Sequence, residues 1–436
     1  MSEPTALAGP VTRAERIDSL DVLRGVAVLG ILVMNIIGFS QIGNAYMVPG
    51  LVEGGVDSVN GVIYFLQRLL ADQKFMSLFA MMFGAGVLLS TRRMDASVAY
   101  RDVETSDGPI DYATPPPPPS PAVRFHYTRM TSLLVLGMIH AYLIWFGDIL
   151  VLYAVCGALV FLFRKLKPTV LLWSAAGFFV LSGLLTLGLG GGMYLAAEFG
   201  DESIDELMLI TPALIADEVA AYRGSYLDQA MWRLTTMPEM QVFMVIMWGP
   251  RVVGLMLVGM ALLKLGLFDA RTPVRKFLPL LVIGLGVGVP LSLVDAVTAL
   301  RNGGDTLFMF SAAMQWNYWG SAFLALAYVP VVMFACKAVG ALLVPVAAVG
   351  RMALTNYLAQ SLIATAFFYT GGRFQAWERW ELAWFVLAVW AVQLVWSPLW
   401  LARFRFGPAE WLWRSINYAK PQPLLRAPRQ PATLPA

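Results

Sequence analysis

Long, uninterrupted apolar runs are the dominant pattern along this chain. Hydrophobic residues are continuous within each run instead of alternating with polar ones, which predicts membrane-spanning helices and argues against β-barrel strands. A helix needs about 20 apolar residues to cross a bilayer. Runs near that length lie at 20–40, 73–90, 127–146, 148–163, 169–196, 240–263, 277–299, 311–336, 352–369 and 382–401. We therefore predict an all-α fold, a polytopic transmembrane bundle of about ten spans.

The composition of the chain agrees with that class. Hydrophobic residues make up 58% of the sequence and charged residues 14%, with a formal net charge of +3. A chain this apolar is expected to have membrane lipid as a partner. The basic residues are spread over several loops, which gives a nucleic-acid partner no support. An oligomer is compatible with this composition.

The placement of the basic residues predicts the orientation of the bundle. Lys and Arg gather before the first span, between the second and third, and after the fourth, sixth and tenth. The loop 41–56 and the turn at Gly147 contain neither residue type. Because cytoplasmic loops carry the excess of Lys and Arg, both termini are predicted to be cytoplasmic and the Gly147 turn extracytoplasmic.

The same pattern divides the chain into segments. We expect a cytoplasmic tail at 1–19, membrane helices at 20–94, a Pro-rich disordered cytoplasmic loop at 95–122, membrane helices at 123–197, an amphipathic extracytoplasmic segment at 198–237, a C-terminal membrane domain at 238–419 and a cytoplasmic tail at 420–436. Within 203–235 apolar residues recur at helical spacing among acids. This predicts one or two amphipathic helices that roof the bundle.

His140 and Asp148 stand at the tip of an apolar hairpin, where polar groups are costly and often functional. Imidazole is the side-chain base that titrates near neutral pH, so His140 is a candidate general base, with Asp148 across the turn orienting its ring. The alternative is a neutral imidazole that hydrogen-bonds between helices. One His and one Asp are too few ligands for a metal, so none is expected.

Three polar residues share one face of the first span. Asp21 and Arg24 are one helical turn apart and can pair with each other or with an anion. Asn35 lies about three turns further along the same face. Alternatives are a cytoplasmic anchor for Arg24 and an interhelical hydrogen bond for Asn35.

Further polar groups interrupt the later spans. Arg251 lies inside an apolar run and is expected to face a polar interior, or to form a structural ion pair with Asp148 or Asp295. In the segment 350–361 three polar side chains are candidates to line a substrate cavity: Asn356, Tyr357 and Gln360.

Two other clusters of polar residues are predicted to have structural roles. Asp72, Gln73 and Lys74 precede the second span and are interpreted as a solvated cap. Glu410 and Arg414, at i and i+4 among tryptophans, are interpreted as part of a short interfacial helix that anchors the C-terminus to the bundle.

These motifs resemble the YeiB-type proteins of bacterial inner membranes, whose C-terminal half is a domain of unknown function. The resemblance is carried in order by SLDVLRGVAVLGILVMNI, GMIHAYLIWFGDILVLYAVCG, RVVGLMLVGMALLKLG, GRMALTNYLAQS and FGPAEWLWRSINY. It covers nearly the whole chain except the Pro-rich insert and the tails. The resemblance implies a multi-pass protein of the bacterial inner membrane.

The YeiB-type proteins are similar in turn to transmembrane acyltransferases such as heparan-α-glucosaminide N-acetyltransferase, which share the LDxxRG-to-Asn opening. That similarity implies acyl transfer from a cytoplasmic acyl-CoA to a hydroxyl or amine of an envelope glycan or lipid. By this analogy Asp21, Arg24 and Asn35 would line the donor route. The histidine that the heparan enzymes carry before their second span has no counterpart here, so His140 would have to act from another helix.

The leading hypothesis is therefore an integral membrane acyltransferase. A secondary transporter of a small polar or anionic solute is the alternative, with Arg251, Asp295 and the His140–Asp148 pair as its polar groups. A non-catalytic membrane protein is the third possibility.

Overall fold

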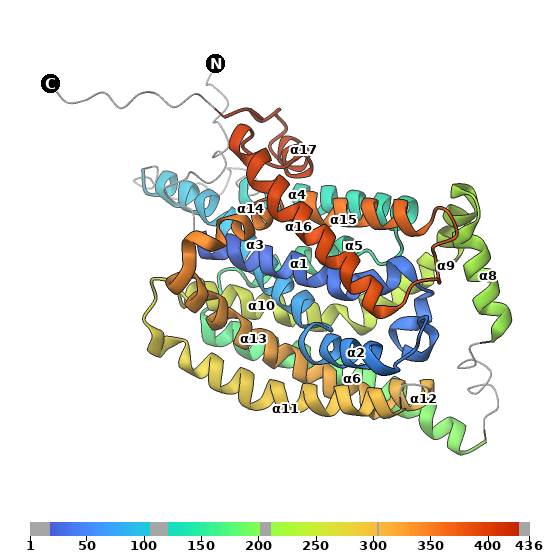
Figure 1. Ribbon diagram of the computed structural model, residues 1–436. Helices are drawn as coiled ribbons and strands as arrows, with labels where there is room; N and C mark the ends of the chain where they lie inside the picture. Colours follow the sequence, from blue (N-terminus) through green and yellow to red (C-terminus); the bar gives the residue numbers. More distant parts are fainter. Residues whose placement is uncertain (1–17, 105–120, 201–210, 303–304, 427–436) are drawn as a thin grey trace, which may run out of the picture.

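The computed structural model describes residues 18–104, 121–200, 211–302 and 305–426, and these residues form a bundle of helices (Figure 1). Over these ranges there is no strand, and the extended backbone pairs only in two isolated bridges, Glu53 with Glu378 and Phe404 with Leu425. The predicted all-α fold is confirmed.

The helices follow the predicted apolar runs. They are α1 (Asp18–Ser40), α2 (Ser58–Leu70), α3 (Lys74–Glu104), α4 (Pro121–Ile139), α5 (Leu150–Val160), α6 (Pro168–Glu198), α8 (Pro212–Arg223), α9 (Tyr226–Met247), α10 (Gly249–Lys264), α11 (Leu278–Asn302), α12 (Thr306–Phe308), α13 (Met314–Val339), α14 (Val344–Arg351), α15 (Ala353–Phe368), α16 (Arg379–Arg403) and α17 (Pro408–Asn417). Two π-turns, His140–Ile144 and Met309–Ala313, extend α4 and precede α13.

Several of these helices are long and apolar enough to cross a membrane. Among the described residues there are 6 such stretches, or 7 when α9 and α10, bent by 52° at their junction, are taken as one span. This is fewer than the sequence predicts, because α4 is not among these stretches and because α5 and α15 are only 11 and 16 residues long. Helices that short do not cross the hydrocarbon core unaided.

The loops gather at two ends of the bundle, one near α17 and one near α8 (Figure 1). At the α17 end Lys264 donates a hydrogen bond to the carbonyl of Arg164 (2.8 Å). At the α8 end the carboxylate of Glu218 accepts one from the amide of Gly43 (2.9 Å). Loops that the charge pattern assigns to the same side of the membrane therefore lie together.

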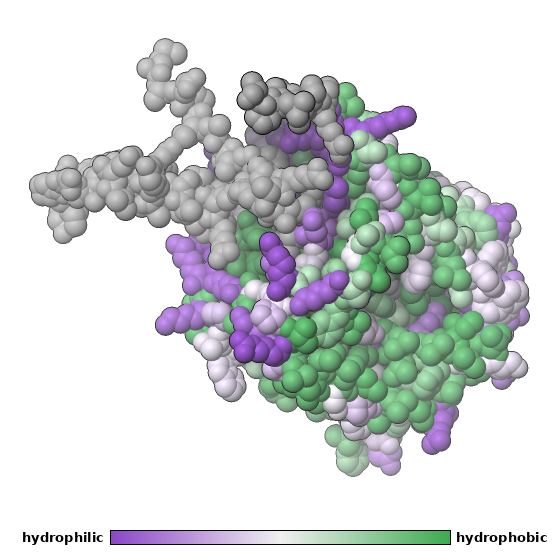
Figure 2. Space-filling model, turned by 60° about the vertical axis from the view of Figure 1, so that its left-hand side comes forward, coloured by the Kyte–Doolittle hydropathy of each residue, from purple (hydrophilic) through white to green (hydrophobic). Residues whose placement is uncertain are grey.

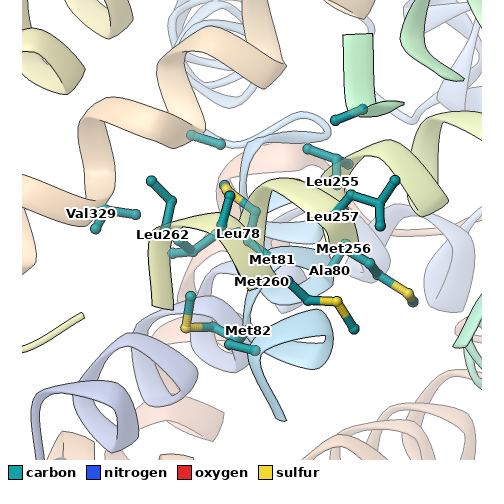
Figure 3. Packing of buried hydrophobic residues seen from close by; sticks show 14 of the residues in the cluster. Leu78, Ala80, Met81, Met82, Leu255, Met256, Leu257, Met260, Leu262 and Val329 are labelled. Carbon is teal, nitrogen blue, oxygen red and sulfur yellow. The ribbon is translucent and has the colours of Figure 1, made fainter. Parts of the chain in front are cut away.

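Close backbone contact joins α3 and α10 at the centre of the core, where Met81, Met256 and their apolar neighbours interdigitate (Figure 3). A Cβ atom on Gly84 would overlap the backbone carbonyl of Met256, and one on Gly259 would overlap that of Met81. Small residues allow membrane helices to approach this closely. The reciprocal pair of glycines thus fixes the spacing of the two helices.

A second reciprocal glycine contact holds α1 against α14. A Cβ atom on Gly25 would overlap the carbonyl of Val346, and one on Gly350 would overlap the carbonyl of Asp21. Gly350 opens the GRMALTN motif, so this motif sets the position of the first turns of α1.

The outer helices α6 and α11 present apolar side chains to the surroundings. Trp173 on α6 is 80% exposed and Val282 on α11 is 60% exposed. Figure 2 shows a broad hydrophobic surface on the face it presents. An exposed apolar surface of this extent is typical of a protein embedded in lipid.

Two predicted non-membrane segments are partly described. The amphipathic segment contains α8 and the first half of α9. Helix α8 lies at the end of the bundle away from α17 (Figure 1). Helix α3 continues to Glu104, past the expected start of the Pro-rich loop. The prolines at 115–119, the tail 1–17 and the chain end 427–436 lie outside the described residues.

Candidate functional site

The predicted pair of His140 and Asp148 forms where α4 ends. The helix widens into the π-turn His140–Ile144, and Trp145 then adopts an extended conformation that leads the chain toward α5. Nδ1 of His140 lies 2.8 Å from Oδ1 of Asp148. The pairing is confirmed, and Asp148 orients the imidazole ring.

This pair is sealed inside the bundle. Nε2 of His140 lies 2.9 Å from Oγ of Ser361 on α15, and Oδ2 of Asp148 accepts a hydrogen bond from the amide of Val151 (2.8 Å). The two side chains are 0% and 1% exposed. Because both ring nitrogens are engaged by protein groups, the pair fastens the hairpin to α15. Its catalytic role stays a prediction.

A cavity of about 620 Å³ lies beside this hairpin at the α8 end. Its wall is formed by α1, the α2–α3 junction, the turn 145–149, α8, α9 and the residues that lead into α13. Asn44 and Met240 on the wall are exposed, so the cavity opens at the surface. Its volume suits a small organic ligand or part of a lipid.

Apolar side chains make up most of this wall. Methionines and tryptophans predominate: Met34, Met47, Met76, Met237, Met240, Met244, Met309, Met314, Trp145, Trp232 and Trp248. Methionine is unbranched and polarizable, so such a wall adapts to ligands of varied shape. The sequence did not single out these residues, because they are distributed over several separate helices.

A buried ionic network forms the polar part of the wall. Arg68 binds Asp72 through Nη1 (2.8 Å) and Asp295 through Nη2 (2.6 Å). Asn317 donates to Oδ2 of Asp72 (2.7 Å) and accepts a hydrogen bond from Lys74 Nζ (2.8 Å). Two cations and two carboxylates balance one another, which is how charge is tolerated at such depth.

The solvated cap predicted at Asp72, Gln73 and Lys74 is wrong. Lys74 is fully buried, and Asp72 and Gln73 lie on the cavity wall. Gln73 has a φ of 60°, a left-handed conformation that is uncommon for residues other than glycine. This turn separates α2 from α3. The burial comes from Asn317, which is 243 residues from Lys74 in the sequence.

Arg251 lies behind the cavity wall, in the polar interior that the sequence predicts. It is fully buried, and its Nη2 donates to Oγ of Ser321 (2.7 Å) and to Oγ of Ser77 (3.2 Å). The guanidinium also lies over the ring of Trp248, with 5.9 Å to the ring centroid. Trp248 separates Arg251 from the cavity.

The alternative ion pair for Arg251 is not present. Asp148 is paired with His140, and Asp295 is paired with Arg68. The partner that Asp295 has instead, Arg68, is 227 residues away in the sequence.

The three predicted donor-site residues of α1 fall into two places. Arg24 Nη1 lies 3.3 Å from Asp21 Oδ1, which confirms that pair at the α17 end. Asn35 lies on the cavity wall instead. The helical rise between Arg24 and Asn35 is about 16 Å.

A second guanidinium accompanies Arg24 at the α17 end. An ideal Cβ on Gly86 would lie 3.5 Å from Nη2 of Arg24 and 4.0 Å from Nη2 of Arg129. Arg129 donates to Oγ of Ser90 (2.8 Å) and lies over the ring of Trp413 (4.7 Å). The proximity of Arg129 to Arg24 on α1 was not predicted from the sequence.

The polar residues of α15 bind neighbouring helices and not the cavity. Asn356 donates to Oγ of Ser397 (3.1 Å), and Gln360 donates to Oε1 of Gln393 (3.0 Å). Tyr357 is 4% exposed. Buried amides of this kind hold membrane helices together. All three predicted residues lie off the cavity wall.

Glu410 anchors α17 to the bundle, as predicted. Its Oε1 accepts hydrogen bonds from the amides of Leu354 (2.7 Å) and Thr355 (3.1 Å), and its Oε2 accepts one from the Thr355 hydroxyl (2.5 Å). These bonds cap the first turn of α15. Burial raises the pKa of Glu410, and the hydrogen bonds from Thr355 oppose that shift.

Comparison with known proteins identifies relatives along the whole chain. A family described as "Protein of unknown function (DUF418)" matches residues 262–420. The uncharacterized protein YeiB of Escherichia coli K12 is 28% identical over 407 residues, which cover 92% of this chain and 96% of YeiB. The uncharacterized protein YxaH of Bacillus subtilis 168 is 30% identical over 443 residues, which cover 96% of this chain and 98% of YxaH. The chain belongs to the YeiB family.

No solved structure matches this YeiB-family chain. The family model covers only part of the cavity wall. Met309, Met314 and Asn317 lie within 262–420, whereas Asn35, Asp72 and the remaining wall residues precede it. The cavity of this YeiB-family protein is therefore built jointly by both halves of the chain.

Proposed function

We propose that the protein is an acyltransferase of the bacterial inner membrane. It takes an acyl group from a cytoplasmic acyl-CoA and transfers it to a hydroxyl or amine of an extracytoplasmic envelope glycan or lipid. The resemblance of the LDxxRG opening to transmembrane acyltransferases supports the reaction class. The observation that carries the proposal is the cavity in which Asn35, from that opening helix, lies on the same wall as the carboxylate of Asp72.

Asp72 is the proposed general base. Its Oδ2 accepts hydrogen bonds from Arg68 and Asn317, while its Oδ1 has no hydrogen-bond partner within the described part of the chain. As the acceptor oxygen or nitrogen attacks the thioester carbonyl, Asp72 takes its proton. The carbon–sulfur bond then breaks, and the proton passes to the sulfur of CoA.

Asn35 is the proposed donor to the oxyanion of this reaction. Its side-chain amide makes no hydrogen bond to other described residues and lies on the cavity wall. A preorganised amide N–H directed at the developing oxyanion lowers the barrier to acyl transfer.

His140 and Asp148 are assigned a positioning role in this proposal. Their hydrogen bond closes the hairpin that presents Trp145 and the turn 145–149 to the cavity. A base must reach the proton that it removes, and the imidazole nitrogens are already bound to Asp148 and Ser361.

The donor would enter from the α17 end, where Arg24 and Arg129 supply two guanidinium groups suited to phosphate. The thioester then has to travel about 16 Å along α1 to reach Asn35. Ala27 and Leu32 on the way are fully buried. The proposal therefore requires α1 and its neighbours to separate when the donor binds.

Acyl transfer by the purified protein tests the proposal. The protein is placed in lipid nanodiscs with labelled acetyl-CoA and an envelope lipid extract, and CoA release and labelled lipid are measured. Asn35→Ala is expected to slow transfer by about 100-fold. The control Asn302→Ala, at an exposed position outside the cavity, should transfer at the wild-type rate. Wild-type protein that forms no labelled product, or equal rates in both variants, would contradict the proposal.

A transporter is the second candidate, because one wall of the cavity is a broken helix. Helices α9 and α10 are bent by 52° where Trp248 reaches the cavity. Discontinuous helices at a polar midplane are typical of secondary transporters. Uptake of a polar solute into proteoliposomes without acyl-CoA would favour this function over acyl transfer.

A further inference from the structure

Several side chains on the cavity wall keep polar atoms without a hydrogen-bond partner among the described residues, and the four considered below are not cations. Asn35 and Gln73 offer amide groups, Asp72 offers Oδ1, and Glu218 offers Oε2. Together they supply donors and acceptors within one cavity. Such groups select a ligand by its hydrogen-bonding character.

The cations near the cavity are already engaged or screened. Arg68 is the single cation on this wall, and both of its terminal nitrogens bind carboxylates. Lys74 is fully buried behind it, and Arg251 lies behind Trp248. The carboxylates of Asp72 and Glu218 lie on the wall, whereas that of Asp148 is bonded to His140 and is 1% exposed. Among the described wall residues an anionic headgroup would therefore meet carboxylates and no cation that lacks a carboxylate partner.

An ammonium headgroup satisfies only part of the hydrogen-bonding capacity of these groups. It can donate to the carboxylates and to amide oxygens, but it leaves the amide N–H groups of Asn35 and Gln73 without an acceptor. A hydroxyl both donates and accepts, so a headgroup with several hydroxyls can satisfy all four side chains. The rings of Trp232 and Trp248 add flat apolar surfaces to the same cavity.

The apolar part of the wall indicates that the ligand carries a chain. The methionines of α9, Met237, Met240 and Met244, follow one another along the cavity at helical spacing. They come from a different helix than Asn35 on α1 and Asp72 and Gln73 at the α2–α3 junction. A ligand that fills both parts is amphipathic.

We propose that the cavity binds a lipid with an uncharged, hydroxyl-rich headgroup. The hydroxyls bind Asn35, Gln73, Asp72 and Glu218, and the chain lies against the methionines of α9. The identification of this lipid as the acyl acceptor rests on the proposed function, whereas its binding requires no acyl-CoA.

Binding of matched amphiphiles tests this inference. The full-length protein is purified without glycoside detergent, placed in nanodiscs and titrated with decyl glucoside, decylamine and decyl phosphate below their micellar concentrations. Tryptophan fluorescence reports occupancy, because Trp145, Trp232 and Trp248 line the cavity. The glucoside is expected to bind at least about tenfold more tightly than either charged amphiphile.

Two methionine variants separate cavity binding from general partitioning into lipid. Met240 lies on the wall and Met138 does not, yet both are 39% exposed. Met240→Phe should weaken glucoside binding by about tenfold, while Met138→Phe should leave it within about twofold of wild type.

Tighter binding of decyl phosphate or decylamine would overturn the inference, as would equal effects of the two methionine variants. Glucoside binding without acyl transfer would contradict the proposed function alone. Acyl transfer without a preference for the glucoside would contradict this inference alone.

Discussion

The amide of Asn317 donates a hydrogen bond to Oδ2 of Asp72 over 2.7 Å, although the two residues are 245 positions apart in the sequence. This bond holds the Asp72 carboxylate on the cavity wall and leaves Oδ1 open to a ligand. Lys74 binds the oxygen of the same amide, so Asn317 cannot rotate without breaking both contacts. The reactivity proposed for Asp72 depends on this fixed orientation.

Replacement of His140 distinguishes a positioning role from a catalytic one. His140→Leu leaves Oδ1 of Asp148 without its hydrogen-bond partner and removes one contact of the Ser361 hydroxyl, and an unsatisfied buried group costs about 1–3 kcal/mol. We expect a clear fall in melting temperature, followed by tryptophan fluorescence. His140→Gln keeps some of the hydrogen bonds and should retain acyl transfer per folded molecule. A His140→Gln protein with wild-type stability and no turnover would instead identify His140 as the base.

The reciprocal glycines of α3 and α10 should tolerate no large side chain. Gly84→Leu or Gly259→Leu would force the helices apart at Met256 and Met81, and we expect loss of folded protein in size-exclusion chromatography. The control is Gly177→Leu on α6, where an added Cβ meets nothing within 4 Å. Equal yields for all three variants would show that this contact does not set the helix spacing.

Glu218 should make stability depend on pH. Burial raises the pKa of this carboxyl above its ordinary value of 4.5, and the amide of Gly43 partly opposes the shift. At pH values between the ordinary pKa of Glu218 in the unfolded chain and its raised pKa in the folded protein, the folded protein binds more protons than the unfolded chain. The free energy of unfolding therefore falls as the pH rises through that range. Glu218→Gln should remove this fall when melting temperatures are compared between about pH 4 and pH 7. An unchanged pH profile in the variant would contradict this assignment.

The elements of the fold could be predicted because each depends on local sequence. Continuous apolar runs located the long helices, and the pair of His140 and Asp148 could be anticipated because one short turn joins them. The broken span was not anticipated. Gly249 and Pro250 follow Trp248 directly, but the apolar run continues through these residues, and the 52° bend lies within it.

The polar wall of the cavity could not be predicted, because its contacts are long-range. The neighbours of Lys74 in the sequence indicated an interfacial residue, but in the structure Lys74 binds Asn317, and α13 packs against α3. Asn356 and Gln360 were predicted to line a cavity, but neither lies on the cavity wall. Their polarity was visible in the sequence, but their partners on α16 were not.

The rate of acyl transfer by Asp72→Asn tests the central claim most directly. Asn preserves the shape of the side chain and can still accept hydrogen bonds from Arg68 and Asn317, but it is a much weaker base. Asp269→Asn is the matched control, because Asp269 pairs with the exposed Arg271 outside the cavity. We expect Asp72→Asn to fold and to transfer acyl groups about 100- to 10,000-fold more slowly than wild type, with Asp269→Asn unaffected. Wild-type rates in folded Asp72→Asn protein would contradict the account.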